Sequence, residues 1–392
     1  MIDEKSEYRR IKKFIHEAAL LQTHELLNEI EEFGTCCKNR NLYKSLKWKY
    51  RWHRIVKPVK VPVGKPTDAW LECQPKPLVS VIVPNYCHSA YLSERIDCIL
   101  NQTFQNFEVI LLDDCSTDGS SELLLSYKKH PKVAHVILND RNSGNTFLQW
   151  EKGISVAKGK YIWIAESDDY ADEEFLEAVM AVFSLHEDCV MVRTGSYQVN
   201  ERGRVLVRDW DIWKEDETMH YYLGSKYIRH NLLHFNFLYN ASMIVFRKDA
   251  FTSLDKCYQS LRYTGDWLCW IELLSRGNVC EYRRKLNYFR QHANKVSTRS
   301  DKTSLGVLDQ IQVMAYVLTN LKLSLLRKIL IRGEQYRLVY RTNFADDEDR
   351  AKAIRILTED LHASKKDYLF YRFVSAFDFL PFIPSAKNDK LR

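Results

Sequence analysis

Short apolar runs of strand length alternate with helical segments between residues 78 and 165. The runs are "LVSVIVP" (78–84), "FEVILLDD" (107–114), "VAHVIL" (133–138) and "KYIWIA" (160–165). Apolar residues at helical spacing fill the intervals, in "YLSERIDCILNQ" and around 119–130 and 146–157. Uninterrupted apolar runs are typical of strands covered on both faces. Strands that alternate with helices at this spacing predict βαβ units and a parallel sheet.

Clusters of polar residues follow the predicted strands. They are "PNY", "DDCSTDGS", "NDRNSGN" and "ESDD". In open α/β sheets, ligands bind beyond the carboxyl ends of the strands. The polar clusters therefore predict a ligand site at that edge of the sheet.

The segments on either side have a different pattern. Residues 6–33 carry apolar positions at helical spacing, and five prolines between 58 and 77 indicate a linker. Residues 301–392 are expected to be mainly helical, as in "LGVLDQIQVMAYVLTNL" and "DEDRAKAIRILTEDLHA". The predicted divisions are a helical extension with a Pro-rich linker (1–74), an α/β domain (75–300) and a helical region (301–392).

Composition narrows the class of protein. In 392 residues, 45% are hydrophobic and 12% aromatic, which allows a sizeable core and argues against general disorder. The net charge of +7 suits anionic ligands or an anionic membrane surface but does not require nucleic acid. Ten cysteines form no framework and no CxxC pair, so a zinc site is not expected. The start "MIDEKSEYRR" lacks the apolar stretch of a signal peptide, and no window approaches ~18 apolar residues. We therefore expect a cytoplasmic protein without a membrane-spanning helix.

Three carboxylates, Glu166, Asp168 and Asp169, stand at the end of a buried strand. Their repulsion must be offset, either by solvent at an ordinary turn or by a bound cation. Asp168 could bind a divalent cation that bridges phosphate oxygens. Asp113 and Asp114 end another strand before a Ser/Thr/Asp/Gly turn. They could cap the next helix, accept from a nucleobase N–H or ribose hydroxyl, or do both.

Five stretches, taken in order, closely resemble family 2 inverting glycosyltransferases of the bacterial polysaccharide-biosynthesis type. They are "VSVIVPNY", "CILNQTFQNFEVILLDDCSTDGS", "AKGKYIWIAESDD", "TGDWLCWIELL" and "YFRQHANKVS". The resemblance covers about 78–300. It implies the GT-A fold, an α/β fold with a mixed, mainly parallel sheet flanked by helices. The N- and C-terminal helical segments are additions to that fold.

The resemblance implies a role for each matching position. Asp266 takes the place of the general base, and Trp270 matches an aromatic position that is more often a core residue than a sugar platform. The implied nucleotide-binding residues are Pro84, Tyr86, Asp113, Asp114 and Ser167, with Asp114 on the uracil and Ser167 near the ribose. The implied metal ligands are Asp168, Glu166 and His292, of which Asp168 is the principal carboxylate.

Three positions depart from the family pattern. Glu166 replaces the more usual first Asp, a longer side chain that can still bind the ion directly or through water. Gly265 replaces the Glu that usually precedes the base, which removes an acceptor-facing carboxylate. Trp150-Glu151 replaces an Arg-Asn pair, so that a diphosphate or ribose contact is either missing or supplied by Lys152 or Arg141.

The resemblance implies transfer of a sugar from a nucleotide-sugar, a UDP-sugar by preference, to a hydroxyl of a glycan or lipid-linked acceptor. The reaction would be a metal-assisted single displacement with Mg²⁺ or Mn²⁺ and with inversion. One alternative is a catalytically silent nucleotide-sugar-binding subunit of a polysaccharide-assembly complex. A nucleotidyltransferase is a second alternative, but "PNYCHSAY" lacks the Gly-rich phosphate loop that class usually has.

Two further segments have open interpretations. Residues 44–60 interleave basic and aromatic residues, which suits an anionic bilayer, a nucleic acid or packing on the catalytic domain. The aromatic-rich segment 367–385 could lie in a membrane interface or complete the helical core. Analogy with lipid-linked acceptors favours peripheral attachment to the inner face of the plasma membrane, and nucleic acid is the less favoured partner.

Overall fold

The structure is a computed structural model. It describes residues 59–206, 211, 215, 217–292 and 305–376. The predicted helix at 6–33 and nearly all of the 44–60 segment lie outside these residues. The chain divides into two compact units. The larger comprises Val59–Tyr227 and Leu238–Thr298, and the described part of the smaller comprises Ile228–Phe237 and residues 305–376.

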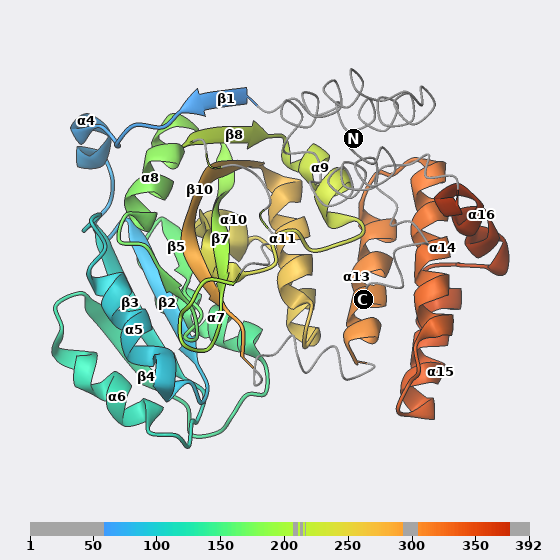
Figure 1. The fold of residues 1–392 in the computed structure, drawn as a ribbon, viewed down its shortest axis with the longest axis horizontal. Coiled ribbons are helices and arrows are strands. Elements are labelled where there is room, and N and C mark those ends of the chain that lie inside the picture. The colour runs from blue at the N-terminus through green and yellow to red at the C-terminus, as the bar shows by residue number, and fades with distance from the viewer. Residues whose placement is uncertain (1–58, 207–210, 212–214, 216, 293–304, 377–392) are drawn as a thin grey trace, which may run out of the picture. The chain divides into compact units, whose positions relative to one another are not determined.

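The described strands of the larger unit form one ten-stranded sheet (Figure 1). The strands are β1 (Val59–Pro62), β2 (Val79–Asn85), β3 (Phe107–Asp113), β4 (Val133–Leu138), β5 (Tyr161–Ile164), β6 (Tyr170–Ala171), β7 (Cys189–Val199), β8 (Thr218–Tyr222), β9 (Ile244–Arg247) and β10 (Asn278–Arg290). Their order is β1-β8-β10-β7-β9-β5-β2-β3-β4, and β6 pairs with β10. β1 therefore joins the sheet from within the segment expected to be a linker.

The sheet is mixed but mainly parallel, as predicted. β5, β2, β3 and β4 pair in parallel, and β7 pairs in parallel with β10. β9 lies between β5 and β7 and runs antiparallel to both, so the two parallel groups share one direction. Their carboxyl ends consequently meet at one edge of the sheet.

Helices cover both faces of this sheet (Figure 1). They are α4 (Asp68–Glu72), α5 (Ser89–Leu100), α6 (Ser120–Ser126), α7 (Thr146–Val156), α8 (Phe175–Leu185), α9 (Gly224–Tyr227), α10 (Lys248–Thr252) and α11 (Gly265–Arg276), with short turns η1 (Tyr127–Lys129), η3 (Ala241–Met243) and η4 (Lys256–Ser260). Alternate strand residues point to opposite faces. Val81 and Val83 accordingly join the core under α5 and α8, whereas Ile82 packs on Gly153 of α7.

The smaller unit is helical, as expected for the C-terminal region. Its elements are η2 (Ile228–Leu232), α13 (Leu305–Asn320), α14 (Leu325–Arg341), α15 (Asp347–Arg355), η5 (Ile356–Asp360) and α16 (Lys365–Ala376). Side-chain oxygens of Ser324 and Asp346 cap α14 and α15 by accepting backbone N–H bonds. α14 and α16 approach closely at Gly333, which has no Cβ. A Cβ at this position would lie 2.3 Å from the carbonyl oxygen of Asp367.

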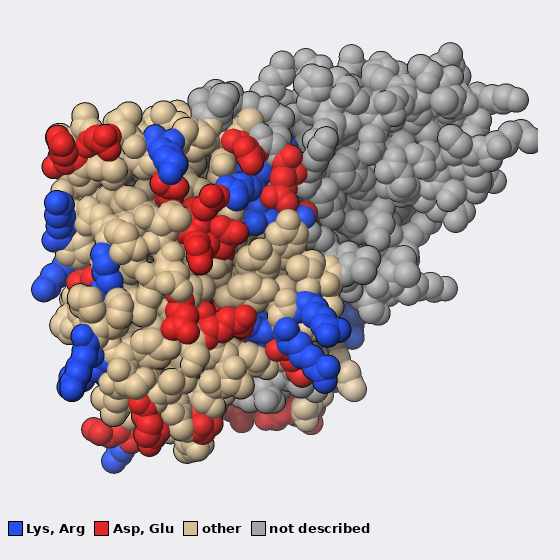
Figure 2. Space-filling model, turned by 60° about the vertical axis from the view of Figure 1, so that its left-hand side comes forward, with Lys and Arg blue, Asp and Glu red and all other residues tan. Residues whose placement is uncertain are grey.

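Two surface properties bear on the predicted partners. Among the described residues, no helix is both long and apolar enough to cross a bilayer. On the face drawn in Figure 2, Lys and Arg side chains are interspersed with Asp and Glu side chains. The excess positive charge is therefore not gathered into one basic stripe on the described part of that face.

Candidate active site

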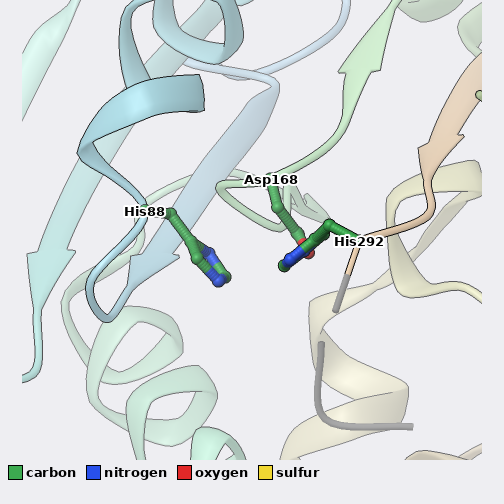
Figure 3. A group of neighbouring side chains, drawn as sticks. All are labelled: His88, Asp168 and His292. Carbon is green, nitrogen blue, oxygen red and sulfur yellow. The ribbon is translucent and has the colours of Figure 1, made fainter. Parts of the chain in front are cut away.

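Asp168, His292 and His88 lie together at the carboxyl edge of the sheet (Figure 3). Asp168 belongs to the turn after β5, and His292 follows β10 by two residues. The Oδ2 atom of Asp168 lies 2.9 Å from Nε2 of His292, and both side chains are largely buried. His88 stands just before α5, and its Nδ1 lies 2.9 Å from the Oγ of Ser167. The structure thus brings together two predicted metal ligands, Asp168 and His292, with a histidine that the sequence did not single out.

The carboxylate of Asp168 is kept in its charged form. Burial alone would raise its pKa, but the hydrogen bond with His292 and the electrostatic influence of the neighbouring imidazoles of His88 and His292 hold the pKa below its ordinary value. An ionised carboxylate beside two imidazoles is a donor set that suits a divalent cation.

The turn that carries Asp168 is fixed by Arg290 and Asp169. Arg290 donates from Nε to the carbonyl oxygen of Asp168 at 2.8 Å and pairs with Glu94. The buried carboxylate of Asp169 accepts from Asn240 at 2.7 Å and from the backbone N–H of Arg290 at 2.9 Å. Burial, together with the charge of Asp168, raises the pKa of Asp169 to about 6. Asp169 therefore holds the turn, and Arg290 is a positioning residue that the sequence analysis missed.

Glu166 has a different environment from Asp168. Its Oε1 accepts the indole N–H of Trp150 at 3.0 Å, and its backbone N–H donates to Ser242. Burial, followed by the charges of Asp168 and Asp169, raises the pKa of Glu166 to about 8. In the absence of a cation this carboxyl group is mainly protonated at neutral pH. Among the described residues, the group spaced for one ion comprises His88, Asp168 and His292 and does not include Glu166.

The carboxylates of Asp113 and Asp114 accept hydrogen bonds from the loops at the carboxyl edge of the sheet. Asp113 is fully buried and accepts from Asn85 at 2.8 Å, from the backbone N–H and hydroxyl of Ser116, and from the hydroxyl of Ser121. These bonds close the turn between β3 and α6. The carboxylate of Asp113 is therefore occupied within the protein.

Asp114 holds the next loop rather than a helix end. Its carboxylate accepts from Asn139 at 2.7 Å, from Gln149 at 2.9 Å, and from the backbone N–H and hydroxyl of Ser143. A carboxylate offers about four lone-pair positions. A direct bond from Asp114 to a nucleobase would require one of these donors to move.

The remaining predicted nucleotide residues differ in exposure. The ring of Tyr86 is 46% exposed, so it offers a free face for stacking, whereas Pro84 is buried within β2. Ser167 is 1% exposed, and the contact shown for its hydroxyl is with His88. The structure therefore leaves Tyr86 as the accessible member of this set.

Asp266 lies in the first turn of α11, and its Oδ1 accepts the backbone N–H of Trp267 at 2.7 Å. α11 packs against β7 and leads through Gly277 into β10, which runs parallel to β7 (Figure 1). The helix must therefore run opposite to β10, and its first turn lies at the edge where β10 ends. This is the edge that carries Asp168.

A chain of side-chain contacts links the start of α11 to Glu166 through Phe147 and Trp150. A Cβ at Gly265 would lie 2.4 Å from the ring of Phe147, which packs on Trp150 at a centroid distance of 5.1 Å. Trp150 in turn donates to Glu166. The ring of Phe147 thus fills the space that a side chain at 265 would need, which is a steric reason for glycine there. Trp270 is fully buried and donates to the carbonyl oxygen of Leu238, so it is a core residue, as expected.

The other departures from the family pattern also have structural roles. Glu151 accepts from the hydroxyl of Tyr258 and pairs with Lys256 at 3.2 Å. Lys152 donates to Asn139, the residue that also holds Asp114, and Arg141 is exposed on the same loop.

Comparison with known proteins agrees with this architecture. Residues 80–254 match the profile of "Glycosyl transferase family 2". Residues 80–254 therefore form a glycosyltransferase family 2 domain. The predicted family and the GT-A fold class are confirmed.

The relatives of this glycosyltransferase domain include two bacterial proteins. TuaG of Bacillus subtilis, named for teichuronic acid biosynthesis, is 35% identical over 131 residues, covering 33% of this chain and 51% of TuaG. Glycosyltransferase GlyG of Streptococcus pneumoniae is 43% identical over 102 residues, covering 26% of this chain and 34% of GlyG. The chain thus spans about half, or less, of the length of these relatives.

Solved glycosyltransferase structures share the fold at low identity. TarS 1-349 of S. aureus in complex with UDP-GlcNAc matches with a TM-score of 0.58 and 17% identity, over 80% of this chain and 92% of that chain. The mannosyltransferase PcManGT of Pyrobaculum calidifontis, in complex with GDP-Man and Mn²⁺, matches with a TM-score of 0.52 and 17% identity, over 86% and 87%.

Proposed function

We propose that the protein is an inverting glycosyltransferase that moves a sugar from a UDP-sugar to a hydroxyl of a glycan or lipid-linked acceptor. The observation that carries the proposal is the position of Asp168, His292 and the first turn of α11 at one edge of a family 2 domain. UDP-GlcNAc in TarS and GDP-Man in PcManGT support a nucleotide-sugar donor. The name of TuaG supports a cell-envelope glycan as the acceptor class.

The donor site fits a divalent cation such as Mg²⁺ or Mn²⁺. Asp168 is ionised, His292 lies against it, and the neighbouring carboxyl groups of Glu166 and Asp169 have raised pKa values that a nearby positive charge would lower. Asp168 and His292 would hold the ion. When bound, it supplies positive charge to the departing diphosphate.

The chain's own residues then perform one displacement. Asp266 accepts the proton of the acceptor hydroxyl, whose oxygen bonds to the anomeric carbon as the bond from that carbon to the diphosphate breaks. The electron pair of the broken bond leaves with the nucleoside diphosphate. Attack from the face opposite the leaving group inverts the anomeric configuration.

Asp266→Asn tests this role, because the amide cannot accept the proton. We expect transfer to fall by about 10²–10⁴-fold while the affinity for UDP stays near that of the parent. UDP release with a panel of donors and acceptors measures the first quantity, and calorimetric titration with UDP measures the second. Asp68→Asn, an exposed first-turn aspartate on α4, is the matched control and should leave both unchanged.

Unchanged turnover in Asp266→Asn would refute the assigned base. UDP binding without UDP release by the parent, with every acceptor tested, would instead favour a silent nucleotide-sugar-binding subunit. The absence of Glu at 265 gives that alternative little support, since Phe147 and the backbone of Tyr258 occupy the space.

The same proposal places the enzyme peripherally on the inner face of the plasma membrane, where a lipid-linked acceptor would be found. In the smaller unit, α16 exposes Leu369, Phe370 and Phe373, with Lys365 and Lys366 in its first turn. Exposed apolar residues beside basic ones suit an anionic bilayer surface.

A further inference from the structure

We propose that His88 is a third metal ligand, so that the site is a two-histidine, one-carboxylate set that favours first-row transition-metal ions over Mg²⁺. The inference deepens the proposed function, because it concerns the ion that would meet the donor diphosphate. It goes beyond the ligands expected from the family resemblance, which were Asp168, Glu166 and His292.

The three side chains are already close enough to share an ion. One ligand atom from each of His88, Asp168 and His292 lies within 4.8 Å of the other two (Figure 3). Ligand atoms bound at about 2.1 Å to a single ion lie at most about 4.2 Å apart. A side-chain adjustment of about half an ångström therefore completes the set.

The relative orientation of the two rings suits shared coordination. The rings of His88 and His292 are 5.5 Å apart between centroids, with an interplanar angle of 89°. They therefore meet edge to face, and the ring of His88 is not stacked over the ring that borders Asp168. Tyr91 packs beside both rings, at 6.3 Å from His88 and 5.4 Å from His292, and limits their movement on that side.

His88 is also held as metal-binding histidines usually are. Such residues commonly bond a polar partner through the ring nitrogen that does not bind the metal. The hydroxyl of Ser167 lies 2.9 Å from Nδ1 of His88 and is almost completely buried. With Nδ1 donating to this hydroxyl, Nε2 carries the lone pair that a metal needs.

The backbone on each side of His88 is fixed as well. The N–H of Cys87 donates to the hydroxyl of Ser116 at 2.8 Å, and the N–H of Ser89 donates to Asp118 at 2.8 Å. Cys87 adopts a φ of 56°, a left-handed conformation that is costly for a residue other than glycine. The turn therefore holds His88 at a defined position at the end of β2.

The ligand chemistry decides which ions the site should prefer. Mg²⁺ favours oxygen ligands and keeps its waters, whereas imidazole suits later first-row ions such as Fe²⁺, Ni²⁺ and Zn²⁺, and affinity for such sites rises from Mn²⁺ through Fe²⁺ to Co²⁺. A site with His88 gains a second imidazole and loses selectivity for Mg²⁺. Mn²⁺ and Co²⁺ are suitable probes because both can be titrated and both give spectroscopic signals.

The decisive measurement is pulsed electron paramagnetic resonance of Mn²⁺ bound to the full chain, without donor or acceptor. We expect nitrogen couplings from two histidines in the parent protein, and this readout needs no variant. In His88→Ala we expect one nitrogen coupling and a loss of Mn²⁺ affinity of at least about tenfold by calorimetry. Ser167→Ala should keep two nitrogens but bind Mn²⁺ less tightly, and His135→Ala on β4 should match the parent.

A single histidine nitrogen in the parent spectrum, or two in His88→Ala, would overturn the inference. Equal affinity of the parent for Mg²⁺ and Co²⁺ would do the same. If two nitrogens bind Mn²⁺ but no sugar is transferred, the proposed function fails and the inference stands. If sugar is transferred with only one nitrogen on the ion, the inference alone fails.

Discussion

Gly265 offers a sharp test of how the start of α11 is positioned. In Gly265→Ala the new Cβ would lie 2.4 Å from Cε2 of Phe147 and 2.5 Å from the backbone oxygen of Tyr258. Carbon atoms in favourable contact are about 3.5–4.0 Å apart, so the overlap with the ring exceeds about 1 Å. The Phe147 ring can rotate or shift, but the carbonyl of Tyr258 moves only with its backbone.

The expected cost follows from these distances. Overpacking of this kind costs about 1–3 kcal/mol, and the gain in helix propensity from Gly to Ala, at most about 1 kcal/mol in a helix interior, is small at the first turn. For a unit of this size, each kcal/mol lowers Tm by about 2–4 °C. We therefore expect a Tm about 2–12 °C lower. Because Asp266 is the next residue, a displacement approaching 1 Å should also lower kcat by about 10²-fold.

Thermal unfolding and initial rates of UDP release measure the two effects. Gly64→Ala is the matched control, because a Cβ at that exposed position would meet no atom within 4 Å. Phe147→Ala should partly rescue Gly265→Ala, so the two changes should be non-additive. A Gly265→Ala protein that melts and turns over like the parent would refute both the steric argument and the placement of Asp266.

Two further predictions concern the acidic turn and the smaller unit. In metal-free protein the pKa of Glu166 is about 8, against about 4.3 in an unfolded chain, so the unfolded state loses its proton first as pH rises. The free energy of unfolding should therefore fall by up to about 1.4 kcal/mol per pH unit between about pH 4.5 and 8 and then level off. The stability difference between parent and Glu166→Gln, measured in EDTA from pH 5 to 9, should show this dependence, and a constant difference would contradict the assigned pKa. In the smaller unit, replacing Leu369 and Phe373 by Ser should weaken sedimentation with anionic vesicles by about tenfold or more. Leu325→Ser, at an exposed leucine of α14, should not, and equal sedimentation of all three proteins would argue against α16 as the membrane contact.

The local pattern of the chain predicts much of the parallel sheet. The apolar runs at 78–84, 107–114, 133–138 and 160–165 correspond to β2, β3, β4 and β5 within one or two residues. The insertion of β9 between β5 and β7 was not predicted, because β9 lies some 80 residues from β5 in the chain and only tertiary pairing sets its place. Likewise β1 joins the sheet from a Pro-rich segment through pairing with β8.

The residues of the candidate site were likewise predicted only in part from the sequence. The acidic residues at 166–169 stand out because carboxylates rarely follow a buried strand without a reason, and the family resemblance adds His292. His88 carries no such signal. Its position depends on the left-handed backbone conformation of Cys87, a position where the sequence has neither the glycine nor the asparagine that usually signals such a conformation. It also depends on a contact with Ser167, which lies 79 residues away in the chain. The hydrogen bonds that Asp114 accepts from Ser143 and Gln149 were not predicted from the sequence pattern either.

The bonds made by Asp114 have a consequence for protein engineering. To change the nucleobase specificity of an enzyme, one usually substitutes the residue thought to contact the base. Asp114, the aspartate that the family resemblance assigns to the base, accepts hydrogen bonds from Asn139, Ser143 and Gln149, so a substitution there would also release the loop that these residues hold. Variant libraries aimed at a new donor should therefore change Tyr86, whose ring is exposed to solvent, and keep Asp114 with its hydrogen bonds.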